Sequence, residues 1–267
     1  MQTLRTYLHY ITTGFRGQAQ YPASLAMLVV GQFLSTTIEV IGVWALFHRF
    51  GQIRGWGFGE VAVFYGQVAV TFAVADSIWR GFDIFGVTFV KTGDFDRLLL
   101  RPRTTSFQLM AYQVRLSPLG RLAQGAIIFG IGAAQTHLAI GPATCMILLW
   151  AFAGGVALFG GILILQATLS FWTVESLEVA NVLTYGGVQA AQYPLGVYAG
   201  WFRDLLIFVV PIGCISYYPM VAVLGLHDPL GAPDWLLPIA PLAGFVFLGV
   251  SLWVWGFGVR RYTSTGS

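Results

Sequence analysis

The sequence predicts an all-α polytopic membrane protein, and three observations support this fold class. Hydrophobic residues make up 57% of the 267-residue chain and charged residues only 9%, with a mean hydropathy of +0.73. Several apolar runs approach the roughly 20 residues that a helix needs to cross a bilayer. Backbone in lipid must satisfy its own hydrogen bonds, which leaves helices or a closed barrel. The runs over 146–153 and 159–165 lack the period-two alternation of a barrel strand, so helices are predicted.

The first predicted element is an interfacial amphipathic helix over 1–21. Leu4, Leu8, Ile11 and Phe15 are spaced as neighbours on one helical face. Such a face suits a helix that lies in the membrane interface rather than crossing the bilayer. The alternative is a frayed terminus in which the spacing arises by chance.

Six transmembrane helices are predicted within one domain over 22–258. Pro22 opens the first span, and Gly141 and Pro142 form a tight turn between the third and the fourth. Residues 173–200 are more polar and are expected on the inner side, and residues 259–267 form a polar cytoplasmic tail. The predicted spans are 22–47, 59–80, 119–139, 143–172, 201–225 and 236–258.

The distribution of basic residues predicts the orientation. When both termini lie in the cytoplasm, only Arg49 and Arg54 of the 14 Lys and Arg residues fall on outer loops. The opposite orientation breaks the positive-inside rule. Both termini share a side only if the number of spans is even, which six satisfies. The same rule accounts for the pI of about 9.0, so nucleic-acid binding is not predicted.

No catalytic or metal-binding pattern is present in the sequence. The four histidines are scattered, and no HExxH, GxSxG or paired-carboxylate spacing occurs. Cys145 and Cys214 lie in apolar segments without metal-ligand spacing and are expected to be buried packing thiols. A phosphate-binding loop needs GxxxxGK[ST], but the one lysine, Lys91, follows Val90. If transport is driven by ATP, another chain is therefore expected to supply the motor.

A basic segment, Lys91–Arg103, lies between the second and third predicted spans and is called the docking loop below. Gly93 interrupts the preceding helix, Asp94 is a favourable N-cap, and Pro102 ends the short helix that follows. This pattern predicts a short helix at a membrane surface, because four cations in this segment cannot lie in hydrocarbon.

The short helix is predicted to carry an apolar ridge. Phe95, Leu98 and Leu99 are spaced at i, i+3 and i+4 on one face. The flanking charged residues are Asp96, Arg97 and Arg101. Such a ridge either presses into a groove on a partner protein or rests on lipid headgroups with its arginines on phosphates, and the residues by themselves favour neither.

Several motifs together resemble a family of bacterial ABC transporter permeases of the type-2 exporter class, the ABC-2 family transporter proteins. The first is Gly-Asp-Phe-Asp-Arg-Leu-Leu-Leu-Arg-Pro over 93–102, preceded by Phe82-Asp83. The others are Phe171-Trp172, Gln192-Tyr193-Pro194, the Phe-Val-Val-Pro run over 208–211, and Tyr217-Tyr218-Pro219. Their order and spacing extend the resemblance over most of the chain.

The resemblance implies six spans, the N-terminal interfacial helix, and a cytoplasmic coupling helix between spans two and three. It also implies a second permease copy or a related permease, nucleotide-binding ATPase subunits that hold ATP and magnesium, and the bacterial cytoplasmic (inner) membrane. This chain itself is expected to carry no cofactor. By the resemblance, the contact with the ATPase comprises Asp94, Phe95, Asp96, Arg97, Leu98, Leu99, Arg101 and Pro102.

Polar and small residues within the spans have two interpretations each. Glu39 in the first span either lines a substrate path or bonds across a dimer, or it is protonated or hydrogen-bonded for structural reasons. Asp76 and Arg80, at i and i+4, are predicted to form a local ion pair. Glycine pairs over 154–161, and Gly196 with Gly200, are predicted to allow close helix packing.

The sequence thus predicts the permease subunit of an ATP-driven exporter that moves an amphipathic substrate by alternating access. The substrate, and the choice between a homodimer and a heterodimer, stay open. The alternatives are an ion- or proton-coupled secondary transporter, for which Glu39 is the one good ionisable residue, a non-transporting membrane scaffold, and a membrane-bound enzyme.

Overall fold

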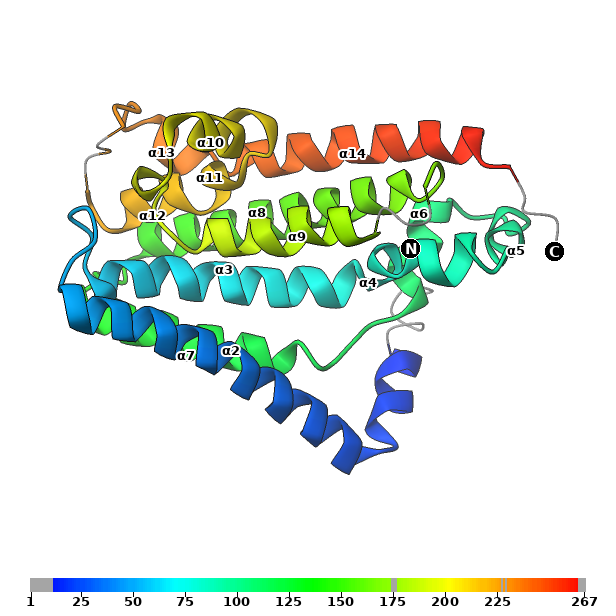
Figure 1. Cartoon of the computed structure of the whole chain (residues 1–267), viewed down its shortest axis with the longest axis horizontal. Coiled ribbons are helices and arrows are strands. Elements are labelled where there is room, and N and C mark those ends of the chain that lie inside the picture. The colour runs from blue at the N-terminus through cyan, green and yellow to red at the C-terminus, as the bar shows by residue number, and fades with distance from the viewer. Residues whose placement is uncertain (1–11, 174–176, 227, 229, 264–267) are drawn as a thin grey trace.

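A computed structural model describes residues 12–173, 177–226, 228 and 230–263, with side chains omitted over 177–183. Apart from one isolated bridge between Ile53 and Trp56, the regular structure of these residues is helical, which confirms the all-α class. Long helices run side by side along the molecule (Figure 1). They are α2 (Pro22–Phe50), α3 (Phe58–Ile78), α7 (Leu119–Gln135), α8 (Pro142–Leu169), α9 (Leu177–Ala191) and α14 (Leu242–Arg261).

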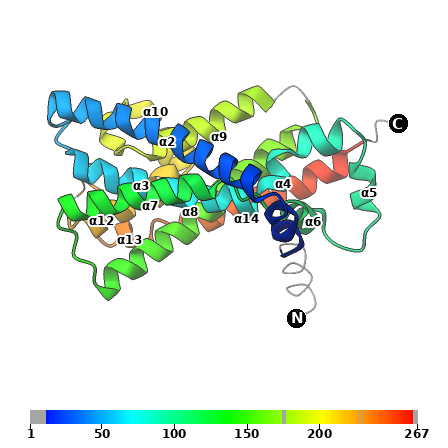
Figure 2. The ribbon, with the colours of Figure 1, turned by 90° about the horizontal axis from the view of Figure 1, so that it is seen from below.

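Helices α3 and α8 form the middle of the bundle. Most of α3 and α8 is buried, whereas α2 and α14 expose most of their apolar side chains. Figure 2 shows α2 crossing the outside of the bundle over α3 and α7. In a protein that crosses a membrane, such exposed apolar helices face lipid or a neighbouring subunit rather than water.

Glycines set the closest helix crossings. A Cβ at Gly244 of α14 would lie 2.1 Å from the carbonyl oxygen of Gly154 in α8, and one at Gly66 of α3 would lie 2.5 Å from the backbone nitrogen of Phe129 in α7. Only glycine permits backbones to approach this closely. The predicted packing role of Gly154 is thus confirmed, but Gly196 has no atom within 4 Å of its would-be Cβ, so the same prediction for Gly196 is wrong.

Four stretches are long and apolar enough to cross a bilayer, over 22–50, 58–78, 142–169 and 236–261. The third predicted span corresponds to α7, which has 17 residues and is about 25 Å long at 1.5 Å per residue. The predicted span over 201–225 is instead two helical stretches, Gly200–Val209 and Ile212–Val223, which meet at 71°. Pro211 at the break has no N–H to continue the first stretch. By length and composition, the described residues contain four spans, or five if the bent pair counts as one span, so the predicted count of six is not confirmed.

The short helices divide between the two ends of the bundle (Figure 1). One end holds α4 (Arg80–Asp83), η1 (Gly86–Val90), α5 (Phe95–Leu99), α6 (Thr105–Tyr112) and the end of α14. The other end holds η3 (Leu195–Val197), α10 (Gly200–Asp204), η4 (Leu205–Val209), α11 (Ile212–Ile215), α12 (Tyr217–Val223) and α13 (Leu236–Ile239). The docking loop thus lies at the opposite end from the bent pair.

The predicted interfacial helix over 1–21 lies partly outside the described residues, which begin at Thr12. Residues 12–19 are helical. Gln18 accepts a hydrogen bond from the backbone nitrogen of Leu116 at 3.0 Å and donates one to the carbonyl of Val114. These bonds attach the helix over 12–19 to the segment that leads into α7.

Asp228 organises the loop before α13. Its carboxylate accepts hydrogen bonds from the Tyr217 hydroxyl at 2.7 Å and from the backbone nitrogens of Leu230 and Ala232 at 3.0 and 2.9 Å.

Asp228→Ala is expected to lower the free energy of unfolding by about 3 kcal/mol, because buried donors lose a charged acceptor. Unfolding in detergent measures this. Asp204→Ala, which removes an exposed carboxylate, should change it by less than about 0.5 kcal/mol; equal effects would contradict the prediction.

Candidate functional site

The short helix α5 is held by an aromatic cluster. Phe95 is fully buried, and its ring centroid lies 5.1 Å from that of Phe85 and 5.5 Å from that of Phe171. Trp255 of α14 is edge-on to Phe85 at 5.0 Å, and Tyr262 is edge-on to Phe95 at 4.9 Å. Edge-to-face pairs at these distances add to the stabilisation from burial. The cluster therefore joins the docking loop to the ends of α8 and α14.

This arrangement corrects the prediction of an outward apolar ridge. Phe95 is fully buried and Leu98 is only 5% exposed, so both face the protein's own core. Of the predicted ridge, Leu99 alone is exposed, at 44%. A helix of five residues with apolar positions at i, i+3 and i+4 has an apolar face, but the sequence does not say what covers it.

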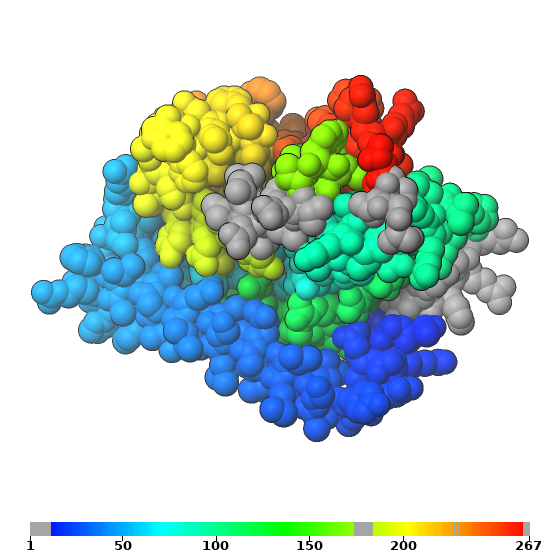
Figure 3. All heavy atoms as spheres, turned by 45° about the vertical axis from the view of Figure 1, so that its right-hand side comes forward, coloured from blue at the N-terminus to red at the C-terminus, as the bar shows by residue number. Residues whose placement is uncertain are grey.

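The outward surface of the docking loop consists of other residues. The side chain of Arg97 is 81% exposed, and Leu100, which is not among the predicted contact residues, is 87% exposed. Arg101, Pro102 and Arg103 are exposed as well. Figure 3 turns this end of the molecule toward the viewer, with the segment around α4 to α6 projecting near the end of α14.

Asp94 precedes α5 but does not cap it in the predicted way. No hydrogen bond runs from the backbone of α5 to its side chain. Its carboxylate instead pairs with Arg97 at 3.0 Å and accepts a hydrogen bond from the Thr92 hydroxyl at 3.1 Å. The half-buried Asp96 lies in the first turn of α5, where a negative charge interacts favourably with the helix dipole.

A groove of about 460 Å³ runs between the docking loop and α6. It is lined by Leu98, Arg101, Pro102, Arg103, Phe107, Gln108, Ala111 and Tyr112. The amide of Gln108 donates hydrogen bonds to the carbonyls of Leu98 and Arg103, both at 2.9 Å. Gln108 therefore fixes the two ends of the exposed turn, a role that sequence spacing did not indicate.

Gln108→Met keeps the length of this side chain and removes both hydrogen bonds. Amide hydrogen exchange over 98–103 is expected to accelerate about tenfold, which corresponds to about 1.4 kcal/mol of lost local stability. Exchange mass spectrometry on the full chain measures it. Exchange over 58–78 serves as the internal control and should not change. A uniform acceleration over both segments would mean that Gln108 supports the whole fold instead.

A chain of polar side chains leads from this end into the bundle. Arg80 pairs with Asp76 at 3.6 Å, which confirms the predicted ion pair, and also with Asp83. The Gln166 amide of α8 donates to Asp83 at 3.5 Å, and its carbonyl accepts a hydrogen bond from the Thr184 hydroxyl of α9 at 2.7 Å. Segments near the docking loop are thereby bonded to two long helices.

Glu39 lies beside a small polar cavity between α2, α3, α7 and α9. The cavity has a volume of about 180 Å³ and is lined by Glu39, Tyr65, Ala69, Arg121, Tyr185, Val188, Gln189 and Gln192. Glu39 is exposed and accepts a hydrogen bond of 3.4 Å from the Tyr65 hydroxyl. The guanidinium of Arg121 lies 5.0 Å from the centre of the Phe72 ring. Glu39 was predictable as a charged residue within an apolar span, whereas the residues opposite it come from distant segments of the chain.

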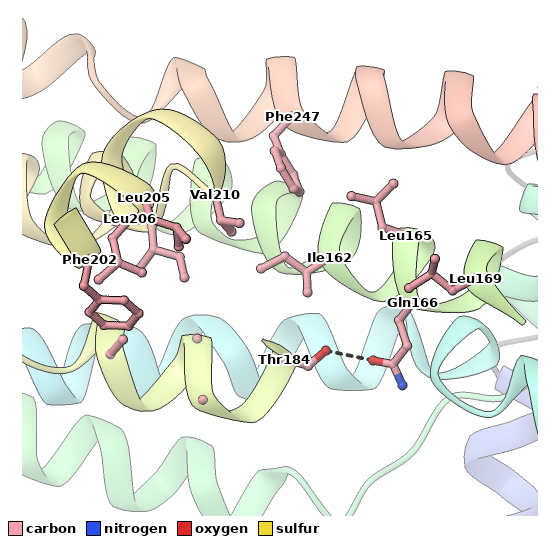
Figure 4. Close-up of a pocket in the computed structure, with 14 residues that line it drawn as sticks. Ile162, Leu165, Gln166, Leu169, Thr184, Phe202, Leu205, Leu206, Val210 and Phe247 are labelled. Atoms are coloured by element: carbon pink, nitrogen blue, oxygen red, sulfur yellow. Dashed lines mark hydrogen bonds between the residues drawn. The ribbon is translucent and has the colours of Figure 1, made fainter. Parts of the chain in front are cut away.

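A larger and almost entirely apolar cavity of about 300 Å³ lies on the other side of α9 (Figure 4). Its walls include Ile162 and Leu165 of α8, Phe202 and Leu206 of the bent pair, and Phe247 of α14. The polar residues in its wall, Gln166 and Thr184, bond to each other (Figure 4). The cavity therefore offers an apolar ligand burial but little to orient it.

The described residues hold no group of three or more His, Cys, Asp or Glu arranged to bind a metal ion. Cys145 and Cys214 are free thiols. Cys145 is exposed on α8 and Cys214 is half-buried, so the expectation that both are buried is wrong for Cys145. It lies in the first turn of α8 and faces away from the bundle.

The chain matches a protein-family model described as ABC-2 family transporter protein over residues 33–266. The match includes the docking loop, the residues around the polar cavity and the bent pair. Comparisons with curated proteins and with solved structures gave no significant match.

Proposed function

Since the chain belongs to the ABC-2 transporter family, we propose that it is the permease subunit of an ATP-driven exporter whose ATPase is a separate polypeptide. The observation that supports this most directly is the docking loop. It presents exposed cations and two exposed leucines, Leu99 and Leu100, on and just after a helix that is anchored from behind by buried aromatic rings. A rigid, charged projection of this kind suits contact with a soluble motor subunit.

The docking surface in this proposal consists of Arg97, Leu99, Leu100, Arg101 and Arg103. Leu100 is the apolar anchor, and the arginines supply charge complementarity to acidic residues of an ATPase. Phe95 and Leu98 act from behind as the support that holds the surface in place. A lipid headgroup layer is the other surface that could contact such a loop, and the experiment below separates the two.

Motion of the ATPase would reach the transmembrane helices along two routes. The aromatic cluster connects Phe95 to Phe171 after α8 and to Trp255 of α14. The polar chain connects Asp83 to Gln166 and Thr184. ATP binding can shift the permease between inward- and outward-open states only if the docking surface makes different contacts in each.

The path of the chain supports a six-crossing arrangement with one change from the sequence prediction. Helix α9 packs against α3 and α8, so we assign it the fifth crossing. The bent pair, Gly200–Val209 with Ile212–Val223, then forms a re-entrant segment at the outer end, and α14 returns the chain to the inner side. Both termini and the docking loop lie in the cytoplasm in this arrangement, as the positive-inside rule requires.

Co-expression with candidate ABC ATPase subunits that lack membrane spans of their own, followed by purification in lipid, tests the proposal. A stoichiometric complex with vanadate-sensitive ATPase activity is the expected result. Labelling of a cysteine introduced at Arg101 in a variant lacking Cys145 and Cys214 should occur only from the cytoplasmic side. Labelling of that cysteine from outside the cell would contradict the proposed orientation and, with it, the docking of a cytoplasmic ATPase.

A further inference from the structure

The polar cavity beside Glu39 carries two opposite charges that do not neutralise each other. Among the side chains that the structure describes, no basic group lies within 4.0 Å of the Glu39 carboxylate, and no carboxylate lies that close to the Arg121 guanidinium. The nearby Asp76 is paired with Arg80. Charges within membrane-spanning helices are costly unless they are paired or hydrated. A cavity that keeps two of them apart is thus suited to a ligand that pairs with both.

Each charge is held in place but retains bonding capacity. The Tyr65 hydroxyl gives Glu39 one long hydrogen bond of 3.4 Å, and a carboxylate can accept about four. Arg121 stacks over the face of Phe72, which positions the guanidinium without using any of its five N–H donors. Phe72 is itself fixed edge-on by Tyr185 at 5.9 Å. The cation and the anion are therefore positioned by aromatic residues rather than by each other.

Gln192 supplies an independent sign that the cavity is incomplete. It is 4% exposed and lines the cavity, yet its side-chain oxygen is buried without a hydrogen-bond donor among the described residues. An unsatisfied buried acceptor costs about 1–3 kcal/mol. An ammonium group bound between Glu39 and Gln192 would satisfy this oxygen and the carboxylate together, and the Tyr65 ring would add a favourable aromatic surface.

The volume limits the size of the ligand. About 180 Å³ is similar to the ~150 Å³ of a cavity that holds one benzene molecule. This space accepts a small polar group but not an acyl chain, a peptide or a sugar oligomer. The exposed position of Glu39 on α2 leaves the cavity open toward the outside of the helix bundle.

We propose that this cavity binds a zwitterionic group, with its ammonium on Glu39 and Gln192 and its phosphate or carboxylate on Arg121. The group is either the headgroup of a phospholipid of the phosphatidylethanolamine type or a free solute of the same chemistry. If the ligand is the transported substrate, this inference rests on the proposed export function and defines the class of the substrate. Binding itself does not require that function.

The test uses the full chain, purified in mild detergent and exchanged into nanodiscs that contain phosphatidylethanolamine and phosphatidylglycerol in equal amounts. Lipid that stays bound after transfer back to detergent is counted by native mass spectrometry. We expect retention of phosphatidylethanolamine at one per chain. Glu39→Gln should lower this retention about tenfold without affecting phosphatidylglycerol, since it removes one charge-assisted contact. Arg121→Gln should lower retention of both lipids.

Arg203→Gln and Asp204→Asn are the matched controls, because they remove the same charges from an ion pair that does not line the cavity, at the end of the molecule opposite the docking loop (Figure 1). Both should retain phosphatidylethanolamine as the parent chain does. Thermal unfolding of each variant verifies that it is folded. Soluble phosphoethanolamine, titrated into the delipidated chain, identifies the source: binding with the same dependence on Glu39 and Arg121 assigns the cavity to a free solute.

The inference is overturned if neither the lipid nor phosphoethanolamine binding depends on Glu39 and Arg121. The inference is also overturned if the purified chain is a dimer that binds neither the lipid nor phosphoethanolamine. In that case the second copy, rather than a ligand, completes the cavity. Measuring ATPase binding on the same preparations separates the two proposals. If the ATPase binds but headgroup binding does not depend on Glu39 and Arg121, only the ligand assignment is contradicted. If the headgroup binds as expected but no ATPase binds, only the proposed export function is contradicted.

Discussion

Leu100→Glu combined with Arg101→Glu is expected to abolish binding of the ATPase while the permease stays folded. Leu100 is the most exposed large apolar residue of the docking loop, at 87%, and Arg101 beside it is also exposed. Loss of an apolar anchor together with reversal of a neighbouring charge weakens an interface by about 4 kcal/mol or more, which is about a thousandfold in affinity. Neither side chain supports the core, so stability should change by less than about 0.5 kcal/mol.

Affinity purification with the ATPase, and ATPase activity of the reconstituted complex, measure this effect. Leu100→Met with Arg101→Lys is the matched control, because it keeps the apolar area and the charge, and it should retain the complex. Increasing salt should weaken the parent complex, since part of its affinity comes from exposed charges. Retention of a full complex by the double glutamate variant would show that the motor binds elsewhere.

Phe95→Ala is expected to have the opposite outcome, a loss of the fold at this end rather than a loss of a contact surface. Phe95 is fully buried and packs against Phe85, Phe171 and Tyr262 at 4.9 to 5.5 Å between ring centroids. Truncation of a buried phenylalanine lowers the free energy of unfolding by about 3–5 kcal/mol. In a chain of this size the midpoint temperature should fall by about 10 °C.

Unfolding in detergent, followed by tryptophan fluorescence, measures the loss of stability. Phe95→Leu is the control and should lose about half as much, because it keeps most of the apolar volume. ATPase binding should fall in Phe95→Ala in parallel with the folded fraction and recover at low temperature. An unchanged midpoint with lost ATPase binding would instead place Phe95 in the docking interface, as its sequence position first indicated.

The sequence determined the features that depend on composition and on local pattern. Low charge and long apolar runs require membrane helices, and the motif over 93–102 with its successors predicted the family that the comparison confirms. The ion pair of Asp76 with Arg80 was also predictable, because residues at i and i+4 are neighbours on any helix.

Only the tertiary structure decided which face of each element is covered. The helix over 95–99 has an apolar face in either interpretation, but Phe171 and Trp255, from segments far away in the sequence, make that face internal. The apolar run over 201–225 is long enough to cross a membrane, yet the break at Pro211 bends it by 71°.

The polar cavity likewise required the fold. Glu39, Tyr65, Arg121 and Gln192 lie on four segments of the chain, and no spacing in the sequence relates them. Periodicity reports only neighbours within one helix, because a helix fixes the positions of its own residues relative to one another and not relative to residues of other helices. Which helices then meet is decided by close packing, here at glycines such as Gly66 and Gly244.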